Sequence, residues 1–184
     1  MPLPHYTQSR ASSQRYEPVQ PNLFEVTIFS PLGDDTGLIL EQVNSIGGLN
    51  RLNPSIDAIG QKYKFADRSF ASMPGQTFVD LTLNFSLNLN EANENYIYNT
   101  FRNWTNLIYD PLTGEMGLKK DYVGSMIVVQ YNRAGDIFRK VTFKDVFPTA
   151  QMDFIDELNY TTPDAAQLSM TYRCDHWVEE NVGS

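Results

Sequence analysis

The strongest pattern in the chain is an unbroken alternation of apolar and polar residues over residues 77–89, TFVDLTLNFSLNL. Strand side chains alternate sides with period 2, so this segment predicts one long strand with an apolar and a polar face. At about 3.3 Å per residue it would span roughly 40 Å. The apolar face carries Val79, Leu81, Leu83, Phe85, Leu87 and Leu89. The polar face follows Phe78 with Asp80, Thr82, Asn84, Ser86 and Asn88, a smooth and slightly acidic row without Lys or Arg.

Shorter runs of the same kind predict the rest of a mainly β fold. Two of them flank the turn NRAGD and together form a hairpin signal. In the last run, Leu168, Met170, Tyr172 and Cys174 share one face. The strands expected besides the long one are 23–29, 38–43, 62–70, 122–131, 137–147 and 166–177.

One helix is expected in the middle of the chain, at about residues 91–109. Asn90 stands where a helix N-cap would, and Asp110-Pro111 ends the pattern. Residues at helical spacing mark one buried face: Ile97, Phe101, Trp104 and Ile108. The helix aromatics Tyr96, Phe101 and Trp104 could also line a ligand site, but aromatic residues at this spacing usually belong to a core.

The remaining segments suggest how the chain is divided. Residues 1–20 are polar, contain proline and have no periodicity, so we expect an N-terminal arm before a single domain of residues 21–184. Residues 44–61 hold three Gly and one Pro without a clear period and predict a long loop. Loops of this length are uncommon in compact domains unless they have a role.

Composition argues against several classes of partner. The net charge is −8, from 14 basic and 22 acidic residues, so we do not expect binding to the nucleic-acid backbone. No apolar run reaches about 18 residues, and the N-terminus lacks the apolar core of a secretory signal. We therefore expect neither membrane insertion nor export by that route. The single Cys174 cannot form an internal disulfide, which suits a reducing compartment.

No motif indicates catalytic or metal-binding chemistry. Cys174 and His176 are two residues apart, but zinc requires four ligands and the sequence offers no second pair. The simpler interpretation of this pair is the end of a core-facing strand. Adjacent carboxylates at 34–35 and 156–157 point apart on a strand or face water on a loop. We therefore expect no enzyme activity, no cofactor and no metal.

Several phrases, occurring in order along the chain, carry a resemblance to a known family. They are PNLFEVTI after the polar arm, DRSF before the long strand, FRNWTNLI in the helix, VVQYNRAGDIFRKVTFKDVFPTA across the hairpin, and LSMTYRCDHW at the end. Together they resemble tail tube proteins of contractile-tailed bacteriophages and inner tube proteins of phage-like contractile injection systems. The resemblance covers about residues 18–177.

This resemblance implies a small β-sandwich or β-barrel with a flanking helix, which forms rings. The protein would be a virion structural protein of a contractile tail, or part of an injection particle, assembled in the bacterial cytoplasm. Six copies would self-assemble into a ring, and rings would stack into a tube within a sheath, between a baseplate and a tube terminator. DNA, during DNA ejection, or effector proteins would pass through the lumen without specific binding. The lumen-facing residues would be Asp80, Thr82, Asn84, Ser86 and Asn88.

The arm 1–20 and the loop 44–61 are the expected contacts between stacked rings. Two other functions stay open at this point. The chain could be a baseplate-proximal tube initiator or adaptor of the same fold, which forms one ring rather than many. It could also be a monomeric β-barrel that binds a small ligand through Tyr and Trp. Electron micrographs of the purified chain would separate a tube from both.

Overall fold

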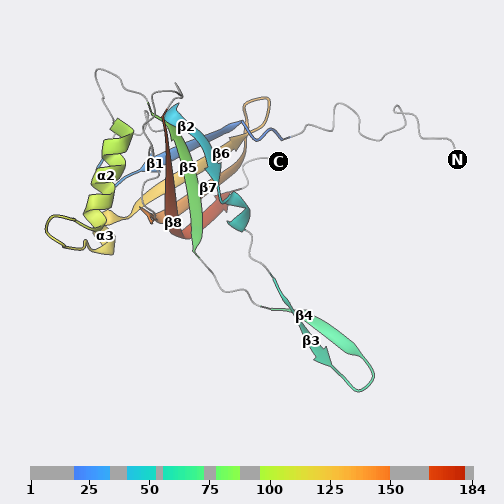
Figure 1. Cartoon of the computed structure of the whole chain (residues 1–184). Helices are drawn as coiled ribbons and strands as arrows, with labels where there is room; N and C mark the ends of the chain where they lie inside the picture. The colour runs from blue at the N-terminus through green and yellow to red at the C-terminus, as the bar shows by residue number, and fades with distance from the viewer. Residues whose placement is uncertain are drawn as a thin grey trace, which may run out of the picture.

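The main body of the protein is one curved antiparallel sheet, which closes almost into a barrel (Figure 1). The computed structural model describes residues 19–33, 41–52, 56–72, 78–87, 96–149 and 166–180. The strand order is β1-β6-β7-β8-β5-β2, so β1 and β2 are the two edges of the sheet. These strands are β1 (Phe24–Phe29), β2 (Val43–Gly47), β5 (Val79–Ser86), β6 (Gly124–Tyr131), β7 (Ile137–Pro148) and β8 (Gln167–Glu180).

The core lies between the concave face of the sheet and helix α2 (Tyr96–Ile108). The long strands β5 and β8 pair over their whole shared length, so the apolar rows of both strands face the same side. Phe101 and Trp104 of α2 pack on Tyr172, with ring centroids 5.9 and 5.6 Å away. The buried residues of the two strands are Val79, Leu81, Leu83, Phe85, Leu168, Met170, Tyr172 and Cys174.

A short helix, α3 (Lys119–Tyr122), ties α2 to the start of β6. The indole N–H of Trp104 donates to the Tyr122 carbonyl oxygen at 2.6 Å. Gly124 follows at a point where the backbone of β1 and the Trp104 ring approach very closely. A methyl group at Gly124 would overlap the Phe29 carbonyl oxygen and lie 3.0 Å from the indole. Only glycine fits here without a shift of neighbouring atoms.

Two strands outside the main sheet, β3 (Ala58–Lys62) and β4 (Asp67–Ala71), form a hairpin that projects from the body (Figure 1). It is preceded by the 3-10 helix η2 (Leu49–Leu52). The expectation of a long loop at 44–61 is therefore wrong, because this segment contains most of β2, η2 and the start of the hairpin. The expectation of a single strand at 62–70 is also wrong, because the chain reverses there, with Tyr63 N–H donating to the Ala66 carbonyl at 2.9 Å.

The hairpin strands show no periodic pattern in the sequence because they bury no face. All ten residues of β3 and β4 are exposed, so no alternation of apolar and polar residues is required of them. Strand β2 is an edge strand with a bulge between Val43 and Ser45, which breaks its period. The strand expected at 38–43 is wrong at its described end, since residues 41–42 are helical and β2 begins at Val43.

The other expected elements are confirmed within the described residues. Strands β1, β6, β7 and β8 lie where the alternation predicts them, and residues 79–86 of the expected long strand form β5. The helix is confirmed over 96–108, with Ile97, Phe101 and Trp104 buried. Residues 1–18, 34–40 and 88–95 lie outside the described residues, so the arm and the first turn of the expected helix do too. No helix in the described parts is long and apolar enough to cross a membrane.

Candidate assembly surfaces

The polar face of the sheet is a continuous surface that alternates with the core along β5 and β8. Its residues lie opposite each other across the two strands in the register Asp80 to Arg173, Thr82 to Thr171, Asn84 to Ser169 and Ser86 to Gln167. The four β5 residues are half-buried, whereas the apolar residues between them are fully buried. The alternation in the sequence therefore placed Asp80, Thr82, Asn84 and Ser86 together correctly. Asn88 lies outside the described residues.

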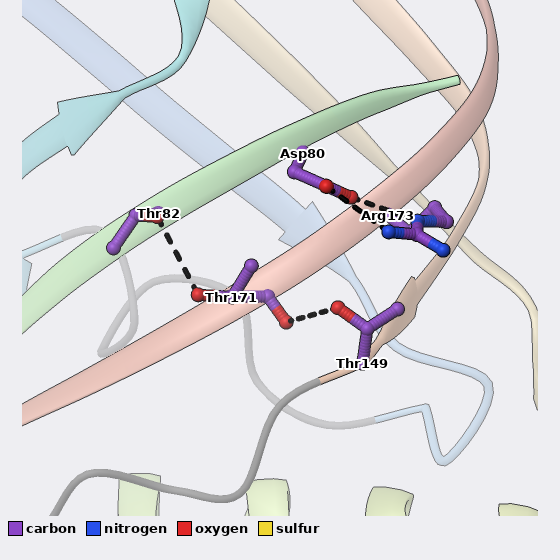
Figure 2. Close-up of polar contacts among 5 residues, drawn as sticks. All are labelled: Asp80, Thr82, Thr149, Thr171 and Arg173. Atoms are coloured by element: carbon purple, nitrogen blue, oxygen red, sulfur yellow. Dashed lines mark hydrogen bonds and ion pairs between the residues drawn. The ribbon is translucent and has the colours of Figure 1, made fainter. Parts of the chain in front are cut away.

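The charged end of this face is a paired arginine and aspartate. Arg173 donates from Nε to Asp80 Oδ1 at 2.8 Å and from Nη2 to Oδ2 at 3.0 Å (Figure 2). Its guanidinium also stacks on the Phe78 ring, 3.9 Å from the centroid. The hydrogen bonds to Asp80 raise the pKa of Arg173 above its ordinary value. Two-pronged pairs of this geometry fix both side chains in one orientation.

Hydroxyl groups continue the polar face along β8. Thr82 and Thr171 place their Oγ1 atoms 3.4 Å apart across the two strands (Figure 2). Thr149, just after β7, donates its backbone N–H to the Thr171 carbonyl at 3.0 Å, and its hydroxyl reaches the same oxygen at 3.5 Å. These contacts link neighbouring hydroxyl groups within the face, and the residues in its middle are uncharged.

Amide side chains join β5 to the edge strand β2 on the same surface. Asn84 Nδ2 donates to Ser45 Oγ at 2.8 Å. Asn44 Nδ2 donates to Ser86 Oγ at 2.6 Å. The face is thus a network of short, uncharged side chains with one internal ion pair at its end.

The polar row of β5 has no Lys or Arg of its own, but β8 contributes Arg173 directly opposite Asp80, so the charged end of the face is neutral rather than acidic. Reading β5 alone could not find this residue. The signal was present in the last strand, where the residues between the buried ones are Gln167, Ser169, Thr171 and Arg173. Pairing the polar rows of the two longest strands would have predicted a neutral face.

The β3–β4 hairpin presents a second surface, which is apolar and basic. Ile59 and Phe70 face each other across its strands. Ile59 is 58% exposed and Phe70 is 49% exposed. Phe65 in the turn is 91% exposed. We call residues 62–68 the hairpin tip. Lysine and arginine side chains lie over its rings, with Lys64 Nζ 5.4 Å from the Phe65 centroid and the Arg68 guanidinium 5.8 Å from that of Tyr63.

A third surface is the α2–α3 loop, residues 109–118. It exposes large apolar side chains, with Leu112 at 94% and Met116 at 74%. Backbone hydrogen bonds nevertheless hold the loop in place. Asp110 N–H donates to the Glu115 carbonyl at 3.0 Å, Gly114 N–H to that of Asp110 at 2.8 Å, and a β-bridge joins Tyr109 to Met116. The loop is a defined apolar projection rather than a collapsed segment.

The seam between the two edge strands forms a fourth surface. A cavity of about 660 Å³ lies there, between the start of β1 and strand β2. Apolar side chains that are only half-buried line it, together with asparagine, serine and glutamine side chains. The apolar residues are Phe24, Val43, Ile46 and Leu49. We call this cavity the seam cavity.

In the described parts of the chain, no three His, Cys, Asp or Glu side chains lie close enough together to hold a metal ion. Cys174 is buried, and its thiol donates toward the carbonyl oxygens of Lys144 and His176 at 3.3 and 2.8 Å. Burial raises the pKa of Cys174 to about 11. The interpretation of Cys174 as part of a core-facing strand end is confirmed, whereas His176 is exposed.

Solved structures similar to this chain match it over almost its whole length. One is a chain of the sheath-tube complex of an extracellular contractile injection system (PVC) in the extended state, 19% identical, with 98% of this chain and 100% of that chain covered and a TM-score of 0.57. The second is a chain of the tube-terminating cap of the anti-feeding prophage (AFP), at 19% identity, 97% and 100% coverage and a TM-score of 0.61. This chain has a tube-type fold.

A third structure with the tube-type fold is a chain of the PVC sheath/tube terminator in the extended state. It is 20% identical to this chain, and the match covers 90% of this chain and 98% of that one, with a TM-score of 0.58. The three descriptions name tube, cap and terminator assemblies, and none names an enzyme. No protein-family model matches the sequence, and no curated protein matches it. The expected mainly β, barrel-like fold of the tail tube type is confirmed.

Proposed function

We propose that this chain is a structural, non-catalytic tube subunit of a contractile injection particle or contractile phage tail. Copies form hexameric rings, and the rings stack into the inner tube through which DNA or effector proteins pass. The observation that carries this proposal is the tube-type fold, matched over 98% of the chain by a component of a sheath-tube complex. Sheath, baseplate and tube-terminator proteins would be its partners, and the assembled particle its location.

The polar face of β5 and β8 would line the lumen of this tube. Its amides and hydroxyls bond to each other, and its described ion pair is closed on itself. A surface without unpaired Lys or Arg offers no phosphate-binding site, so a nucleic acid would slide past it. A polypeptide would meet short, uncharged side chains, several of which already bond to each other.

Electron microscopy of the purified chain tests the proposal directly. At high concentration, negatively stained samples should contain long tubes with a regular ring repeat. Removing residues 1–18 should leave folded, ring-competent subunits that stack poorly, because the arm is expected to join successive rings. A monomeric sedimentation profile at every concentration would refute the tube function.

A second candidate is a ring that ends or starts a tube rather than extending it. The cap chain of the anti-feeding prophage gives a TM-score of 0.61, against 0.57 for the sheath-tube chain, so the fold alone favours neither role. Single rings without tubes in the same micrographs would indicate this second function. Monomers stabilised by a small ligand in the seam cavity would instead indicate a binding protein.

Lysine substitutions test whether the polar face lines the lumen. The variant Asn84→Lys with Ser86→Lys leaves the pair of Asp80 and Arg173 intact. Its tubes should retain a labelled DNA oligonucleotide at low salt, protect it from nuclease and release it at high salt.

The matched control carries Asn103→Lys and Asn106→Lys, two amides on the exposed side of α2. DNA bound to these tubes should be digested, because it lies outside. Equal digestion in both variants would mean that β5 does not line the channel.

A further inference from the structure

The β3–β4 hairpin lacks the packing that a stable hairpin needs. Its ten strand residues are all exposed, and its strands pair only with each other among the described residues. Two-stranded hairpins are marginal in water unless a third layer covers them. Figure 1 shows the hairpin extending from the body, at the opposite side from the α2–α3 loop. No described part of the chain covers its apolar residues, so a second molecule could supply the missing layer.

The α2–α3 loop is well ordered but leaves large apolar side chains exposed. Its hydrogen bonds hold it in one conformation, yet Leu112, Met116 and Leu118 remain mostly exposed. Exposed apolar side chains on an ordered projection are typical of interaction sites. Because the conformation is already set, little entropy is lost when a partner covers these side chains.

The charges of the two surfaces are opposite. The hairpin tip carries three basic side chains, Lys62, Lys64 and Arg68, and one acidic side chain, Asp67. The α2–α3 loop carries two acidic side chains, Asp110 and Glu115, and no basic one. Lys119, which follows the loop, is engaged by Asp175. Opposite charge around an apolar contact selects the correct partner and suppresses others.

We propose that the hairpin tip of one copy docks on the α2–α3 loop of a second copy of this chain. The contact joins two different surfaces, so it repeats from copy to copy and builds a ring or a helix rather than a closed dimer. This inference deepens the proposed function, because it rests on self-assembly and names the two surfaces that meet. Charge complementarity favours this site over the seam cavity, which is lined by uncharged residues.

Photocrosslinking identifies the docking site of the hairpin tip. Phe65 is replaced by the photoreactive residue p-benzoylphenylalanine, because its side chain is among the most exposed of the described residues. Irradiation of the assembled protein, followed by mass spectrometry, should give intermolecular links to the α2–α3 loop, residues 109–118. Links to the seam cavity or to any other region, or no links in assembled material, would overturn the inference.

A charge exchange provides an independent test. Glu115→Lys and Lys64→Glu alone should each raise the critical concentration for assembly about fivefold, the order expected for losing a few exposed charge pairs in a repeated contact. The double variant should return close to the unmodified value. Absence of this rescue would overturn the pairing of the two surfaces.

The outcome also separates this inference from the proposed function. Normal tubes with links elsewhere would overturn the docking site and leave the tube function intact. Links to residues 109–118 in small oligomers that never become tubes would support the docking site and refute the tube function.

Discussion

Truncating Leu83 to alanine measures how much the alternation of β5 contributes to stability. Leu83 is 0% exposed and lies in the middle of the strand. Its cross-strand neighbours are Ile46 of β2 on one side and Met170 of β8 on the other. Both neighbours are held by ladder hydrogen bonds, so they cannot move far to fill a space left by the substitution.

The expected cost follows from the buried volume. Leu83→Ala removes about three methylene equivalents, each worth about 0.8 kcal/mol of transfer free energy, which gives about 2.4 kcal/mol. The cavity that remains adds a further penalty, because a paired sheet relaxes only partly. We expect the free energy of unfolding to fall by about 3–4 kcal/mol in total, within the range of about 2–5 kcal/mol for such truncations.

The assay is urea unfolding at a concentration where sedimentation shows monomers, so that assembly does not contribute to the measured stability. Thr82→Ala is the matched control, because Thr82 is adjacent to Leu83 in the strand but lies on the polar face. It should cost less than about 1 kcal/mol, because it removes only a half-buried hydroxyl contact of 3.4 Å. Equal effects of the two substitutions, or a larger effect at Thr82, would refute the assignment of faces to β5.

Three further substitutions test the core. Gly124→Ala should destabilise the chain by about 1–3 kcal/mol in urea unfolding, since a methyl group there meets the Phe29 backbone and the Trp104 ring; an unchanged midpoint would contradict this packing. Tyr172→Phe should stabilise it by about 1 kcal/mol in the same assay, because the buried hydroxyl has no hydrogen-bond partner among the described residues; destabilisation would mean that a partner exists. Raising the pH from about 9 to 11 should lower the free energy of unfolding, because the folded pKa of Cys174 is raised from 9.0 to about 11 and the unfolded chain loses this proton first. Cys174→Ala should flatten that slope, and an identical slope in both proteins would rule out the thiol as its cause.

The sequence was sufficient for the elements that bury one face against the core. In β5 and β8, burial imposes a strict period of 2, and in α2 it imposes a period of about 3.6 on Ile97, Phe101 and Trp104. These periods are local, so they can be recognised without knowing which strands pair. The hairpin of β6 and β7 could be predicted equally well, because a short glycine-containing turn separates two such runs.

The missed features depend on pairs of residues that are far apart in the chain or on segments that bury nothing. Arg173 and Asp80 are 93 residues apart, and only the pairing of β5 with β8 brings them together. The hairpin carries no period, because both of its faces are exposed. The seam cavity could be predicted only from the strand order, which makes β1 and β2 the edges of the sheet.

In the proposed tube, a hairpin without packing in the free subunit would make growth partly a folding reaction. Holding backbone in one conformation costs about 1–2 kcal/mol per residue, and the free subunit recovers little of this for β3 and β4. Under the proposed docking, two free subunits that meet would have to order their hairpins before any contact is strong. A subunit that joins an existing ring would find docking sites already arrayed around its rim. Tubes should consequently appear after a lag, and added fragments of tube should abolish that lag.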